Sequence, residues 1–191
     1  LVPVAGPAPT AEGGWASGDY SRTTGLQGDG NALYIDSNYL DNADGDDDNH
    51  RAVFHTPAVT QGGLIGVRTD DGILPFHGTH LFQGAGSLAR NRCFGSITHS
   101  VNDNTENTFS GISRSLSSEY TFRSQGTSDT VSQNSDVAGR GINVRIFGRG
   151  HDVVQNLFDG SIAFYSIGSS ADLEVLDTAV TNLITAIGEA L

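Results

Sequence analysis

The 191-residue chain contains no methionine, and its ten basic residues are all arginines because lysine is also absent. The 22 acidic residues outnumber them and give a formal net charge of -12 at pH 7. A surface with such an excess of carboxylates repels nucleic acid phosphates and anionic membranes. We therefore expect no nucleic acid partner and no membrane partner.

Cysteine and long apolar runs are scarce as well. Cys93 is the only cysteine, which excludes an internal disulfide framework and a cysteine-based zinc cluster. No apolar run approaches the roughly 20 residues that a membrane-spanning helix requires. The sequence therefore predicts a domain without membrane insertion that is held together by its packed core.

The chain is rich in glycine and in short segments in which polar and apolar residues alternate. It contains 25 glycines, and 37% of its residues are apolar, which is typical of short strands joined by many turns. Alternation of polar and apolar residues predicts strands at 32–36, 50–56, 63–68, 93–100, 108–115, 120–124, 130–133, 142–148 and 161–167. The pattern is weaker over 74–91. We expect one all-β domain, a sandwich of two antiparallel sheets.

The one strongly helical pattern lies after Gly168. Apolar residues recur three and four positions apart, at Leu173, Leu176, Val180, Leu183 and Ile187. This spacing predicts an amphipathic helix over 170–191, with Ser169 or Ser170 as its N-cap. The stripe either docks on the β core of its own chain or forms a coiled-coil seam for assembly with other copies. Docking is favoured because about three heptads are marginal for a coiled coil.

The start of the chain has a different character. Residues 1–14 contain Pro3, Pro7 and Pro9 and few side chains that could anchor a core. We expect an extended arm or linker over 1–14 and the sandwich over 15–191. An arm on a neighbouring subunit and an unstructured terminus remain open alternatives.

Several blocks together resemble a known family. They are SRTTGLQGDGNALYIDSNY at 21–39, NHRAVFHT at 49–56, ISRSLSSEYTFRSQG at 112–126, INVRIFGRG at 142–150 and the segment 158–191 that contains AFYSIG. In this order they resemble the concanavalin A-like (LamG-like) jelly-roll domains of tailed-phage and prophage structural proteins, over Tyr20–Leu191. The resemblance implies a jelly-roll sandwich at a virion surface, with other virion proteins and copies of itself as partners. It brings no catalytic signature.

The sequence DNADGDDDN at 41–49 is dense in carboxylates. Oxygen ligands on a flexible loop suit Ca²⁺, so Asp41, Asp44, Asp46 and Asp48 are candidate calcium ligands. The spacing is not that of an EF-hand, because Ala52 stands where a bidentate glutamate is required. A solvated acidic loop is the alternative, and no other cofactor is expected.

Aromatic residues are the candidates for glycan binding. Tyr39 beside the acidic loop, and Trp15, could stack on sugar rings, although aromatic side chains of strands more often pack inside. Glycoside hydrolysis requires a pair of carboxylates across the bond, and the five glutamates show no such spacing with another acid within a strand. A G-x-S-x-G nucleophile elbow is also absent.

Together with the resemblance, which implies the virion surface, these observations predict a non-enzymatic structural protein, either a capsid decoration protein or a fibre or spike module. Host-surface glycans are its candidate ligand in either role. A free-standing lectin-like carbohydrate-binding module is the alternative from another class, and a glycoside hydrolase is a third.

Overall fold

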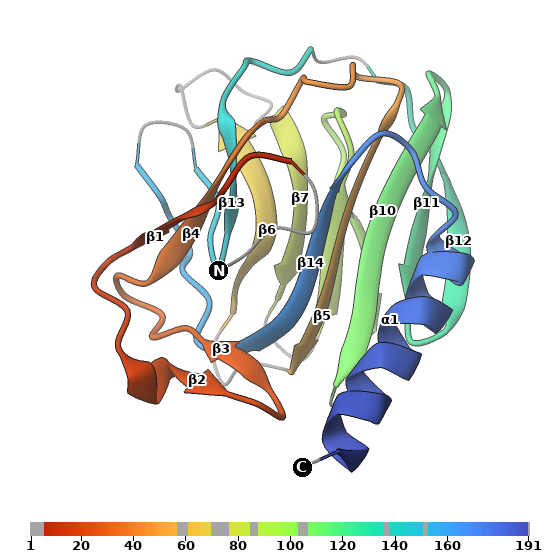
Figure 1. Cartoon of the computed structure of the whole chain (residues 1–191). Coiled ribbons are helices and arrows are strands. Elements are labelled where there is room, and N and C mark those ends of the chain that lie inside the picture. Colours follow the sequence, from red (N-terminus) through yellow and green to blue (C-terminus); the bar gives the residue numbers. More distant parts are fainter. Residues whose placement is uncertain are drawn as a thin grey trace.

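A computed structural model describes residues 6–56, 61–69, 77–84, 88–102, 107–135, 138–150 and 153–190. Within these residues two antiparallel seven-stranded sheets, here named sheet A and sheet B, form a sandwich. One α-helix, α1 (Leu173–Glu189), lies on the outer side of sheet B (Figure 1). The predicted sandwich with a C-terminal helix is confirmed.

The strand orders interleave distant parts of the chain. Sheet A has the order β1 (Thr10–Glu12), β4 (Tyr34–Leu40), β13 (Asn143–Ile146), β6 (Gly62–Thr69), β7 (His77–Gln83), β8 (Leu88–Arg92) and β9 (His99–Asn102). Sheet B has the order β12 (Thr127–Ser132), β11 (Glu119–Ser124), β10 (Thr108–Leu116), β5 (Asn49–Thr56), β14 (Ser161–Gly168), β3 (Gly25–Gln27) and β2 (Tyr20–Ser21). A short 3₁₀ turn at Ser17–Asp19 precedes β2.

The main core fills the space between the sheets. It is built from alternate residues of the strands, which point to one face because successive side chains of a strand alternate. In β5, Val53 joins this core, whereas Ala52 and Phe54 point to the other face and pack beneath α1. This strand is therefore buried on both faces, in keeping with its central place in the sheet.

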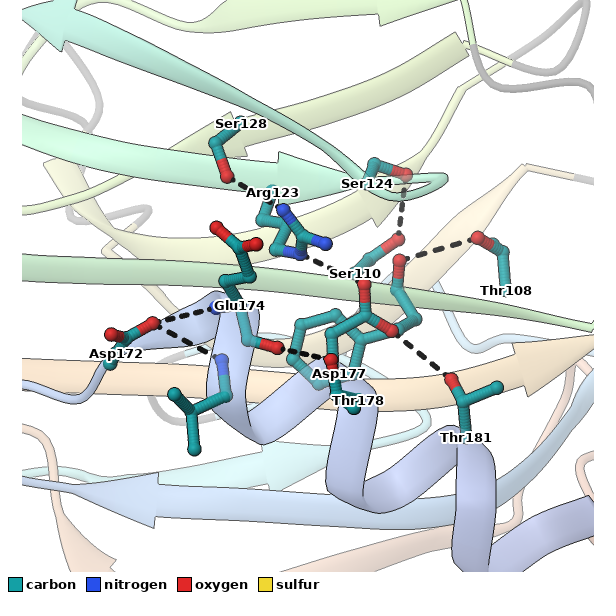
Figure 2. A network of polar contacts seen from close by, with 12 residues as sticks. Thr108, Ser110, Arg123, Ser124, Ser128, Asp172, Glu174, Asp177, Thr178 and Thr181 are labelled. Atoms are coloured by element: carbon teal, nitrogen blue, oxygen red, sulfur yellow. Dashed lines mark hydrogen bonds and ion pairs between the residues drawn. The ribbon is translucent and has the colours of Figure 1, made fainter.

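The helix is held by apolar and polar contacts. Leu173 and Val180 are buried against Ala52, Phe54 and Phe109, and Leu176 and Ile184 are partly buried there. Figure 2 shows the polar part, in which Arg123 of β11 reaches Asp177. Leu183 and Ile187 of the predicted assembly stripe are 52% and 40% exposed. The first half of the stripe thus docks on the β core of its own chain, which is the arrangement that the sequence analysis favoured over a coiled coil.

No helix in the described part of the chain is both long enough and apolar enough to span a membrane.

The start of the helix differs from the expectation. Asp172 is the N-cap, and its carboxylate accepts hydrogen bonds from the backbone N–H groups of Glu174 and Val175 at 3.0 and 3.2 Å (Figure 2). The prediction of Ser169 or Ser170 as the N-cap was wrong because both residues are held by the acidic loop. The Ser169 hydroxyl donates to Asp44, and the Ser170 backbone N–H donates to Asp48.

Two strand predictions need correction. The expected strand at 93–100 does not form: β8 ends at Arg92, Phe94 has a φ of 48°, and β9 begins only at His99. A positive φ turns the chain away from extended geometry. In the weakly patterned stretch 74–91, sheet A gains β7 and β8.

The predicted arm over 1–14 is extended at residues 10–12, where it forms β1. Thr10 pairs with Asp36 and Glu12 pairs with Tyr34, both in β4 of the same chain. The Asn38 side chain also donates to the carbonyl of Ala8 at 2.8 Å. This part of the segment therefore belongs to sheet A, whereas residues 1–5 lie outside the described residues.

Candidate functional site: a groove between the two sheets

A groove of about 720 Å³ opens where β4 and β13 of sheet A face β14 and β3 of sheet B. Its floor is apolar and includes the buried Ile35, Ile146 and Ile162. Pro7 and Pro9 line one side. The two sides come from strands of opposite sheets, whose arrangement Figure 1 shows, so the sandwich itself sets the position of the groove.

Three tyrosines line this groove, one from each of three strands. Tyr20 lies in β2, Tyr39 in β4 and Tyr165 in β14. Tyr20 is 59% exposed, and the other two are half-buried. Tyrosine offers an apolar ring face together with a hydroxyl, a combination suited to a ligand that is partly apolar and partly hydroxylated.

Tyr165 was not among the sequence-based candidates. Its strand alternates, and alternating aromatic residues usually pack inward, so nothing in the local sequence marked it. It does pack against the main core, yet its ring also lines the groove. Burial raises the pKa of Tyr165, and its hydroxyl has no hydrogen-bond partner among the described residues. The hydroxyl is therefore a protonated donor that a ligand can use.

Tyr39 is fixed in place by the acidic loop. Its hydroxyl donates to the Asp44 carboxylate, with both oxygens at 2.8 Å. Burial and this hydrogen bond raise the pKa of Tyr39 to about 12. Tyr39, which the sequence suggested as a glycan contact, lines the groove, and its role in binding stays a prediction.

Trp15, the other predicted glycan contact, lies behind the groove rather than along it. Its indole Nε1 donates to the carbonyl of Tyr34 at 3.1 Å, and its ring packs edge-to-face on Phe147 with centroids 5.2 Å apart. Phe147 itself lines the groove. Trp15 thus packs behind Phe147, a residue of the groove lining. Trp15 and Tyr39 are therefore not brought together in that lining.

The four predicted calcium ligands point to different parts of the fold. The Asp41 carboxylate accepts hydrogen bonds from the backbone N–H groups of Arg140 and Ile142 at 3.2 and 3.0 Å. Asp46 accepts from the backbone of Gly139 at 2.8 Å. Asp44 and Asp48 bind the segment that leads into α1.

The acidic loop therefore joins two neighbouring segments by hydrogen bonds. Within the described residues no three histidine, cysteine, aspartate or glutamate side chains converge as metal ligands would. The structure does not bring Asp41, Asp44, Asp46 and Asp48 together around a common point, and we do not carry the calcium prediction further.

The groove contrasts with the loop in its charge. The described residues that line it include no arginine, histidine, aspartate or glutamate. An isolated charge is costly to place in an apolar site without a partner. The geometry thus suits an uncharged ligand that has an apolar face and hydroxyl groups.

Comparisons with known proteins reveal the fold. No protein-family model matches the chain, and no curated protein matches it. Solved structures do match. The CBM40 domain of the Ruminococcus gnavus IT-sialidase superposes with a TM-score of 0.52 at 15% identity, over 68% of this chain and 81% of that one.

Two larger proteins contain a similar domain. NanB, in a structure with Optactamide, gives a TM-score of 0.57 at 15% identity over 80% of this chain and 27% of its own. The leech intramolecular trans-sialidase gives 0.52 at 10% identity over 75% and 26%. With two antiparallel sheets and these neighbours, the chain has a concanavalin A-like jelly-roll fold. At such identities the likeness concerns the fold alone.

Proposed function

We propose that this domain is a carbohydrate-binding module that holds an uncharged sugar ring in the groove between its sheets. The observation that carries the proposal is the groove itself, in which Tyr20, Tyr39 and Tyr165 surround an apolar floor. Tyrosine faces pack on the C–H faces of sugar rings, and the Tyr165 hydroxyl supplies a hydrogen bond. The domain binds its ligand without transforming it, because the described lining offers no carboxylate pair for hydrolysis.

The structural neighbours support this choice among the functions that a jelly roll can have. The Ruminococcus gnavus CBM40 domain has also been solved with α2,3-sialyllactose bound. Fold alone does not determine function. The proposal therefore depends on the groove, and the neighbours add that a sandwich of this kind can bind a glycan.

The test is a binding measurement on an array of neutral and sialylated oligosaccharides, followed by calorimetry with the best neutral ligand. Replacing Tyr165 by alanine should weaken binding by about tenfold, because it removes both the ring face and the hydroxyl. Tyr165→Phe separates the two contributions by removing only the hydroxyl. Tyr34→Ala is the matched control, since this half-buried tyrosine is not part of the groove lining.

Binding that weakens about tenfold in Tyr165→Ala and stays unchanged in Tyr34→Ala supports the proposal, provided that both variants melt at similar temperatures. No binding to any glycan on the array, or equal loss in the two variants, would overturn it. The location at a virion surface, which the sequence resemblance implies, stays a prediction.

A further inference from the structure

The edge of β14 that faces away from β5 is only partly covered. On one side β14 pairs with β5 from Ser161 to Gly168, whereas on its other side β3 pairs with Ser161 and Ile162 alone (Figure 1). Exposure follows the pairing, because Ser161 and Ile162 are buried and residues 163–168 are half-buried. Among the described residues, no strand covers this edge beyond Ile162.

Two features end the cover at this point. The register of β14 on β5 shifts between Ile162 and Phe164, so Ala163 forms a β-bulge that bends the strand. The β2–β3 hairpin meets the bulge at Gly25, which lies so close that a Cβ on it would clash with the Cα of Ala163. Gly25 therefore marks one end of an open edge that runs over residues 163–167.

This open edge forms part of the groove. Residues 163–167 all line it, and Ser37 and Tyr39 line it from β4 of the other sheet. The edge is roughly 13 Å long, because a strand rises about 3.3 Å per residue. In an antiparallel pair, alternate residues direct their N–H and C=O groups to the same neighbour. Alternate residues of 163–167 therefore present these groups to the groove rather than to β5.

The surroundings of the edge disfavour another protein strand as its partner. Sheet B continues through β3 and β2, so an added strand would meet the β2–β3 hairpin at Ala163. Pro7 and Pro9, which also line the groove, have no backbone N–H with which to pair. The edge is thus recessed between the sheets, where a narrow ligand reaches it more readily than a second sheet does.

We propose that the groove binds a linear, neutral polysaccharide with an extended backbone, and that several of its rings lie along β14 with their hydroxyl groups on the main chain of 163–167. This inference rests on the proposed function and adds the length and shape of the ligand. A hydroxyl both donates and accepts hydrogen bonds, so a row of hydroxyls matches alternating N–H and C=O groups.

The dimensions and the direction of the edge determine the kind of chain. A groove of about 720 Å³ has the size of sites that hold ligands larger than one sugar ring. A strand edge is nearly straight and suits a straight chain. Cello-oligosaccharides are straight, whereas malto-oligosaccharides of the same composition curve because of their linkage. We therefore expect the groove to prefer the cellulose-type chain.

Calorimetry with the intact chain tests length and shape together. The probes are glucose, cellobiose and cellotetraose, and maltotetraose is the matched control of equal size and composition. Cellotetraose should bind about tenfold more tightly than glucose, because more rings reach the edge, and about tenfold more tightly than maltotetraose.

Hydrogen–deuterium exchange of backbone amides tests the main-chain contact directly. Bound cellotetraose should slow the exchange of alternate amides within 163–167 by about fivefold, since each gains a hydrogen-bond partner. The internal control is β12, which is an outer strand of sheet B and has no residue in the described groove lining. Its amides should exchange at the same rate with and without the ligand.

Backbone esters at Ser166 and Ile167 provide matched variants. Each ester replaces one N–H by an oxygen and keeps the side chain. Because adjacent residues face opposite neighbours, one ester should lower the melting temperature by removing a hydrogen bond to β5. The other should keep the melting temperature and weaken cellotetraose binding by about fivefold.

Failure of this inference is distinguishable from failure of the proposed function. Four results would overturn the inference: equal affinity for glucose and cellotetraose, equal affinity for cellotetraose and maltotetraose, unchanged exchange at 163–167, or two esters that both leave binding intact. If another neutral glycan on the array still binds and loses affinity in Tyr165→Ala, the proposed function stands. Absence of binding to every glycan overturns both.

Discussion

Arg123 of β11 and Asp177 of α1 form the polar link between sheet B and the helix. The Arg123 Nε donates to Asp177 Oδ2 at 2.8 Å, and the two side chains are only 10% and 12% exposed. The Thr181 hydroxyl donates to the other carboxylate oxygen, and the Arg123 Nη1 donates to Ser128 (Figure 2). With Leu173 and Val180 packed on the same sheet, this ion pair fixes the rotation of the helix about its axis.

The first prediction concerns this pair. Asp177→Ala should lower the free energy of unfolding by about 2–3 kcal/mol, because it leaves a largely buried guanidinium without its charged partner. Asp177→Asn, which keeps an acceptor oxygen, should cost less. Denaturant unfolding of these variants and of Arg123→Ala/Asp177→Ala measures the coupling. Strictly additive losses in the double variant would show that the pair does not act as a unit.

The second prediction compares the buried and exposed ends of the helix. Val180→Asp should destabilise the protein by about 3 kcal/mol or more, because it buries a carboxylate without a partner. Leu183→Asp should change stability by only about 0.5 kcal/mol, since Leu183 is 52% exposed. Thermal unfolding of both variants checks this. Similar melting temperatures would contradict the docking seen here, and a lower oligomer mass in Leu183→Asp would identify the exposed end as an assembly surface.

The third prediction concerns pH. The His50 Nδ1 donates to the Ser169 carbonyl at 2.5 Å, so its Nε2 accepts from the Ser166 hydroxyl at 2.7 Å. Burial lowers the pKa of His50 below its usual value of 6.5. Because the folded state then binds fewer protons than the unfolded state, this contribution to stability is present above pH 6.5 and is lost as pH falls below it.

Denaturant unfolding at several pH values tests this expectation, with His50→Gln as the comparison. The variant should lose less stability than the wild type between neutral and mildly acidic pH, and an identical slope in both would contradict the assignment. A separate loss is expected near pH 3.8, because hydrogen bonds to Ser170 lower the pKa of Asp48.

The fold class was predictable because its signals are local. The alternation around Val53 and the three-and-four spacing from Leu173 each depend on adjacent residues, and both segments form as expected. The N-cap was mispredicted for a non-local reason. Ser169 and Ser170 are suitable caps in isolation, but carboxylates more than 120 residues earlier in the chain hold them in another conformation.

The candidate sites were less accessible to sequence reasoning. Tyr39 was a candidate from the sequence and lines the groove, whereas Tyr165 was not a candidate, because its place in the groove depends on how β14 faces β4 across the sandwich. The proximity of Arg145, His80 and Arg92 in sheet A could not be predicted for a similar reason. Arg145, His80 and Arg92 are far apart in sequence, and only the strand register brings them into one row.

The position of β14 also has a consequence for how the protein is made. This strand lies between β5 and β3, and β13 lies between β4 and β6, so each sheet is completed in its interior by a late segment. Until β14 leaves the ribosome, β3 and β5 have no partner strand between them, and the apolar residues destined for the core remain open to water. Chains with many such distant pairings fold slowly. We therefore expect nascent chains that stop before residue 160 to depend on chaperones, and the sandwich to close only once its last strand is available.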